Sequence, residues 1–129
     1  MIPRYRAWLK QYNVMVDDVS DLTFFEGNLK FIGRRTVGGV SFQYSVEEIE
    51  LMQSTGVLDK DGQEIFEGDI VKMAKDVYSD PTYYEVIRHR GGAYRLESNQ
   101  HGCELWLRHT NCEVIGNIYE NPELLEEEE

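Results

Sequence analysis

The chain has 129 residues, 41% of them hydrophobic and 29% charged, so we expect one cooperative core and exclude a disordered chain. It carries 24 acidic against 13 basic residues, and the net charge of -11 disfavours nonspecific attraction to nucleic acid or to an anionic membrane. The lack of a long apolar run, a basic leader or a cysteine-rich composition predicts a cytoplasmic protein in which Cys103 and Cys112 are free thiols.

Short segments rich in β-branched and aromatic residues fill the amino-terminal part of the chain. Polar or glycine-bearing stretches separate them, and this spacing predicts a β meander. The segments are residues 5–9, 14–16, 22–25, 29–32 and 40–44.

Residues 46–53 fit two patterns. Ser45 with Glu48 three residues later is a capping-box signal, and apolar residues recur at helical spacing, which together favour a short helix. Alternation at period two from Ile49 to Gln53 favours a strand instead. The sequence leaves both alternatives open.

The second half of the chain begins with a hairpin signal. The Asp61-Gly62 pair lies between apolar positions and predicts a tight turn. Five short strand-like segments follow, divided by Gly or Pro, and they predict a small barrel. They are residues 69–73, 84–88, 93–96, 105–107 and 114–119.

The predicted fold is therefore mostly β: an amino-terminal β meander packed on a small SH3-like β-barrel, with at most one or two short helices. We expect a single compact domain over 1–122, with a meander lobe at 1–54 and a barrel lobe at 55–122. The acidic tail, residues 123–129, is predicted to be disordered because its like charges repel one another.

Two strings of residues resemble a known family. The first string is QSTGVLDKDGQEIFEGDIV at 53–71 and the second string is EVIGNIYENPELL at 113–125, with Arg6-Ala7-Trp8 as a shorter match. Together they resemble the YopX family of phage and prophage proteins. Val57 adds one residue before the Asp-Lys pair, which affects only the hairpin register.

The resemblance implies a phage or prophage origin, a bacterial host cell and a compact, largely β fold. It brings no catalytic residues, because the function of the family is not established. The first string itself is predicted to be structural, since Gly62 and Gly68 supply turn conformations. Its predicted core residues are Ile65, Phe66, Ile70 and Val71.

A nucleic-acid site is one candidate, because basic residues alternate with aromatic residues near the amino terminus. Binding sites for single-stranded nucleic acid combine the same two residue types. Residues 1–46 contain six basic residues and four acidic residues. The candidate residues are Arg4, Arg6, Trp8, Lys10, Arg34 and Arg35. In the structural alternative, Trp8 lies in the core and the basic side chains lie at a sheet edge. The negative net charge of the chain supports this alternative.

Metal sites have weaker support. Zinc could take His101, Cys103, His109 and Cys112, but the usual Cys-x2-Cys spacing is lacking, so buried thiols and surface histidines are the alternative. A calcium loop starting at Asp59 would need Gly at position six and Glu at position twelve, where Glu64 and Ile70 stand. We therefore predict no metal and no cofactor.

No motif nominates a catalytic nucleophile, so we expect a protein that is not an enzyme. Eight tyrosines and two tryptophans exceed what a minimal barrel needs, which favours a protein partner or self-association as a homo-oligomer. We expect no membrane role. Nucleic-acid binding is the first alternative. The second is an acidic mimic of DNA that inhibits a host protein, suggested by the charge of -13 on residues 47–129.

Overall fold

The computed structural model describes residues 4–35, 38, 41–74, 80–89, 92–98 and 102–126, with only the backbone at 35. In these ranges the chain is mostly β, as predicted, with three antiparallel sheets and one short α-helix. It divides into two compact units, Ile2–Gln53 (the first unit) and Ser54–Glu129 (the second unit). That they form a single domain stays a prediction.

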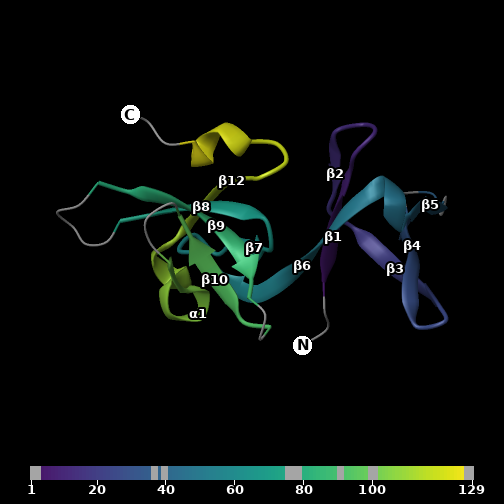
Figure 1. Cartoon of the computed structure of the whole chain (residues 1–129), viewed down its shortest axis with the longest axis horizontal. Coiled ribbons are helices and arrows are strands. Elements are labelled where there is room, and N and C mark those ends of the chain that lie inside the picture. Colours follow the sequence, from purple (N-terminus) through teal and green to yellow (C-terminus); the bar gives the residue numbers. More distant parts are fainter. Residues whose placement is uncertain are drawn as a thin grey trace. The chain divides into compact units, whose positions relative to one another are not determined.

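The first unit contains two sheets (Figure 1). Its strands are β1 (Tyr5–Leu9), β2 (Val14–Val16), β3 (Val19–Phe25), β4 (Asn28–Arg35), β5 (Ser41–Ser45) and the beginning of β6 (Ile49–Leu58). The predicted meander is correct for β3, β4 and β5, which pair in chain order. β1 instead lies between β2 and β6, so its second neighbour comes from much later in the chain.

An apolar cluster holds the first unit together. Its buried members come from both sheets and are Ala7, Leu9, Val16, Ile32 and Ile49. Each fully buried aliphatic side chain contributes roughly 1.5–3 kcal/mol before the entropy cost of folding. A two-residue turn with positive φ at Glu26 and Gly27 joins β3 to β4, the backbone form that a tight hairpin requires.

Both patterns in residues 46–53 describe part of the structure. The Ser45 backbone N–H donates to Glu48 Oε1 over 3.3 Å, and a single 3-10 turn, η1 (Val46–Glu48), follows Ser45. From Ile49 onward the segment is strand β6, because pairing with β1 satisfies its backbone. The capping box therefore forms, but the helix ends after one turn.

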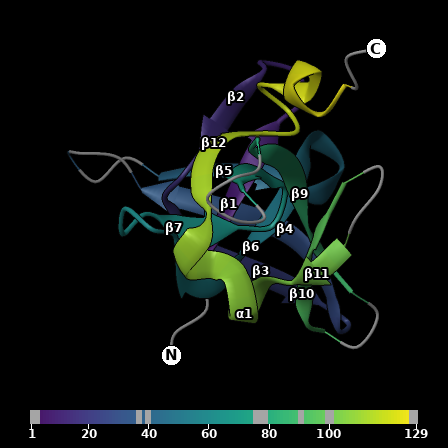
Figure 2. The same ribbon diagram turned by 90° about the vertical axis from the view of Figure 1, so that its left-hand side faces the viewer.

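The second unit contains a curled five-stranded sheet that forms a half-barrel, in agreement with the predicted barrel-like fold (Figure 2). β7 (Glu64–Phe66) pairs with the end of β6. The sheet has the order β11-β10-β9-β8-β12, from β8 (Asp69–Met73), β9 (Thr82–Arg88), β10 (Tyr94–Glu97), β11 (Gly102–Glu104) and β12 (Glu113–Asn117). Its core includes Ile65, Val71, Val86, Leu96 and Cys112.

The strand predicted at 105–107 is wrong. This segment is α1 (Leu105–Arg108), followed by the 3-10 turn η2 (His109–Asn111), and the neighbouring strand is β11. Successive helical residues point in different directions, so only Leu105 is buried, while Trp106 is 67% exposed. Three apolar residues in a row are too few to distinguish a strand from a helical turn.

The predicted acidic tail begins with ordered structure. Residues 123–125, expected to be disordered, belong to the 3-10 helix η3 (Pro122–Leu125), which lies against β9. Pro122 suits the first turn of a helix, and two leucines follow it. Residues 127–129 lie outside the described part. No helix of the described ranges is both long enough and apolar enough to cross a membrane.

Candidate functional site

A groove of about 760 Å³ opens on the second unit, where η3 lies against β9. Its acidic lining residues are Asp80, Glu85, Glu97 and Glu126. Its large apolar lining residues are Tyr83, Leu124 and Leu125. The groove therefore combines negative charge with apolar surface.

Two of these carboxylates face each other across neighbouring strands. The register of β9 and β10 places Glu85 directly opposite Glu97, an arrangement in which like charges destabilise a sheet. Glu97 accepts a bond from Arg95 Nε at 2.9 Å. Glu85 is half-buried; burial raises its pKa, and no bond to another described residue offsets that effect.

The carboxylate pair can bind a cation. A positive group beside Glu85 would compensate a charge that has no bonded partner among the described residues, and nearby apolar side chains could cover an aliphatic stem. A carboxyl of raised pKa is also what a general acid needs. The other polar side chains of the lining are the hydroxyls of Thr82 and Ser98, and no described lining residue is a histidine, a cysteine or a lysine.

The predicted nucleic-acid residues do not form an open basic face among the described side chains. Arg6 and Trp8 are each only 8% exposed, and Arg6 Nε donates to Met52 Sδ over 3.4 Å. Lys10 lies 3.4 Å from Glu50 Oε1, and both Lys10 and Arg4 are exposed. Trp8 is thus buried, as the structural alternative predicts.

The remaining basic candidates lie on β4. Arg34 Nε is 3.3 Å from Asp18 Oδ1, so its charge is paired within the first unit. The side chain of Arg35 lies outside the described part. Lys10 and Arg34 each have an acidic neighbour, which leaves less positive charge available to a phosphate.

The zinc candidates do not gather as one ligand set in the described part of the chain, although Cys103 packs against the apolar cluster that contains Cys112. Cys112 is fully buried, and burial raises its pKa to about 12, whereas Cys103 is half-buried; both are free thiols. His109 Nδ1 lies 2.7 Å from the Leu58 carbonyl oxygen. His101 lies outside the described part, and within that part no three potential ligands gather.

Asp59 organises the turn in the first string. The turn at Asp61-Gly62 forms as predicted, between β6 and β7, with Gly62 at φ +85°. Asp59 Oδ1 accepts the N–H groups of Asp61 at 2.9 Å and Gln63 at 2.8 Å, while Oδ2 accepts that of Val114 at 2.9 Å. Burial raises the pKa of Asp59, but these bonds outweigh burial and lower it.

Two further turns join the first string to the second string. Asp69 Oδ2 accepts the Phe66 N–H at 2.7 Å, and the Gly68 carbonyl accepts the Ile118 N–H at 2.9 Å. Asn117, opposite Asp69 across β8 and β12, accepts the N–H of Glu120 at 2.8 Å. The first and second strings are therefore hydrogen-bonded to each other.

This interlocking gives the strings a structural role. The four apolar residues predicted for the core in the first string are at most 9% exposed, which confirms that prediction. A family model described as YopX protein matches residues 4–126. The chain belongs to the YopX family.

Two solved structures resemble this YopX-family chain over nearly all of their length. Protein EF1440 from Enterococcus faecalis is 30% identical to this chain. The match covers 98% of this chain and 99% of that protein's chain, with a TM-score of 0.68. Protein yopX from Bacillus subtilis is 25% identical, with 97% of each chain covered and a TM-score of 0.68. No curated protein matches the chain.

Sequence reasoning about this YopX-family chain missed the groove. Glu85 and Glu97 lie twelve residues apart, and no motif has that spacing. Their proximity depends on the register of β9 and β10. A usable signal was present, since Glu85 interrupts an otherwise apolar strand, Tyr83–Ile87.

Proposed function

We propose that this YopX-family chain is a non-catalytic accessory protein of a phage or prophage that acts inside the bacterial cell by binding another protein. The groove of the second unit is its binding site. The partner contributes a chain segment that carries a lysine or arginine next to apolar side chains.

The charge of Glu85, which has no bonded partner among the described side chains, carries the proposal. A half-buried carboxylate opposite another carboxylate costs folding free energy, and protein sites that bind ligands commonly retain such a cost. The second unit has 17 acidic and 7 basic residues, so its net charge of -10 attracts a basic segment from a distance. Tyr83, Leu124 and Leu125 supply the apolar contact.

A peptide with alternating lysine and leucine tests the proposal, with a peptide of alternating glutamate and leucine as the control. We expect fluorescence anisotropy to show saturable binding of the basic peptide only. Glu85→Lys should weaken that binding at least about tenfold, equivalent to roughly 1.4 kcal/mol. Glu47→Lys makes the same charge change in the first unit and should bind like the wild type.

Two results would reject the groove as the site: no binding of the basic peptide, or equal weakening by Glu47→Lys. Folding is checked separately with Glu85→Gln. Because the folded-state pKa of Glu85 is raised, its ionisation destabilises the fold as pH rises above the usual value of 4.5. Removing the charge should therefore increase the free energy of unfolding at pH 7, and the gain should disappear at low pH.

A further inference from the structure

The edge of the three-stranded sheet in the first unit has an unusual composition. β5 is an edge strand, because its one neighbour in the sheet is β4. It consists of Ser-Phe-Gln-Tyr-Ser, without charge or proline, and Phe42 on it is 46% exposed. Proteins usually protect a free edge with charge, proline, a bulge or short length, since an unprotected edge pairs with other strands.

The other edge strands in the described part of the chain carry such protection. β3 contains Asp21 and two register shifts, and β12 contains Glu113 and one shift. β2, β7 and β11 are three residues long. β5 is therefore the longest edge strand without a charged residue.

The sequence of β5 is complementary to itself. When two copies pair antiparallel with Gln43 on the two-fold axis, Ser41 lies opposite Ser45 of the second copy and Phe42 lies opposite Tyr44 of the second copy. Gln43 faces Gln43 of the second copy, and two amides can hydrogen-bond to each other. Each position thus meets a compatible side chain, as an isologous contact requires.

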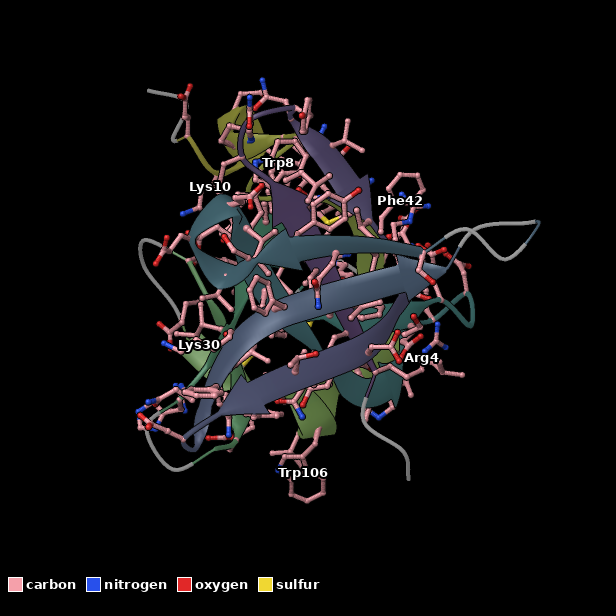
Figure 3. The ribbon with its side chains drawn as sticks, turned by 90° about the vertical axis from the view of Figure 1, so that its right-hand side faces the viewer. Arg4, Trp8, Lys10, Lys30, Phe42 and Trp106 are labelled. Carbon is pink, nitrogen blue, oxygen red and sulfur yellow. The ribbon has the colours of Figure 1, made fainter. Side chains whose placement is uncertain are left out.

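The same pairing would cover exposed apolar surface. Phe42 and Tyr44 lie on the sheet face that carries Ile32, and Tyr44 already packs against the core of the first unit. Figure 3 shows the ring of Phe42 at the margin of this sheet. Aromatic pairs across strands are among the contacts that stabilise sheets.

Charge also permits two copies to meet at this edge. The first unit contains six basic and seven acidic residues, which gives a net charge of -1, whereas the net charge of the second unit is -10. Repulsion between copies is therefore weakest where first units meet.

We propose that two copies of this chain form a two-fold symmetric dimer by antiparallel pairing of their β5 strands around Gln43. The dimer contact lies on the first unit and is independent of the groove proposed above. Since two five-residue strands make a small interface, the dimer dissociates on dilution.

The test measures mass by light scattering over a concentration series up to about 1 mM, where a small interface is occupied. We expect the wild type to approach twice the 15.1 kDa of one chain. Gln43→Lys and Gln43→Glu should each remain at one chain, because like charges meet at the axis. An equal mixture of the two variants should recover the double mass, because opposite charges then meet.

Thr23→Lys is the matched control, since Thr23 is an exposed residue of β3 in the same sheet, and it should behave like the wild type. Amide hydrogen exchange gives a second measurement: residues 41–45 of the wild type should become more protected as concentration rises. A wild type that stays at one chain overturns the proposal. So does a dimer that survives both Gln43 variants, or a mixture that does not recover the double mass.

Discussion

A single carboxylate, that of Asp59, holds together segments that are far apart in the chain. It is 5% exposed and accepts backbone N–H groups from its own loop and from Val114. Backbone donors stabilise the ionised form, so Asp59 stays charged inside the fold without a cation. Its position in the first string is explained by this role and needs no bound metal.

Asp59→Asn should destabilise the protein by about 1–3 kcal/mol, measured as the free energy of unfolding in urea at pH 7. Asparagine keeps one accepting oxygen but presents an NH₂ group to a second backbone donor. Asp61→Asn is the control, because Asp61 is an exposed residue of the same loop and its substitution should change stability by less than about 0.5 kcal/mol.

The pH dependence of this difference has a definite sign. The folded-state pKa of Asp59 is below its usual value of 3.8, so as the pH falls the unfolded chain takes up the proton first. The stabilisation is complete above pH 3.8 and is lost as the pH falls through the folded-state pKa. Wild type and Asp59→Asn should therefore converge below pH 3.8, and a constant difference would contradict the hydrogen-bond assignment.

At the scale of elements, the turn after β12 depends on a close approach of side chain and backbone. A Cβ atom added at Gly116 would lie 2.5 Å from Asn121 Oδ1 and 2.8 Å from its Cγ. That oxygen accepts the Asn117 N–H at 3.3 Å, so Asn121 cannot move without losing the bond. The glycine is required by space and not by its φ angle.

Gly116→Ala should cost about 1–3 kcal/mol of unfolding free energy, as for other substitutions that overpack an interior, measured by thermal or urea unfolding. An Asn121→Ala background removes the two nearest atoms, Oδ1 and Cγ, and leaves the Cβ at 3.0 Å, so the same substitution should cost clearly less there. Additive effects of the two substitutions would show that the close approach does not limit the turn.

Local sequence patterns predicted most of the strands, but they could not predict the pairing of strands that lie far apart in the chain. Short segments rich in β-branched and aromatic residues, divided by glycine, proline or polar stretches, located β4, β8 and β9. Nothing in β1 specifies β6 as its partner, since that pairing is selected by packing of distant segments. The groove was missed for the same reason, because only the strand register brings Glu85 opposite Glu97.

At the scale of the whole molecule, charge is divided unequally between the two units, and this bears on the nucleic-acid alternative. The net charge is -1 on the first unit and -10 on the second. Lys10 and Arg34 on the first unit have acidic partners. Neither unit offers the excess of positive charge on which phosphate binding depends.

We therefore expect no saturable binding of single-stranded DNA or RNA at about 0.15 M salt, measured by fluorescence anisotropy. The decisive observation is the salt dependence. Binding that weakens steeply with added salt and is abolished by Arg4→Glu would establish the nucleic-acid alternative instead. Glu47→Lys serves as a control for the effect of net charge alone.

The bonds from Asp59 and Lys60 to residues 112–114 set an order for folding during synthesis. All strand partners of the first unit have left the ribosome once residue 53 has emerged. The loop of Asp59 must wait for the last strand of the chain before its carboxylate finds the Val114 amide. The strand partners of the first unit are thus available before those of the second, and early termination before residue 112 would leave the Asp59 loop without its anchor.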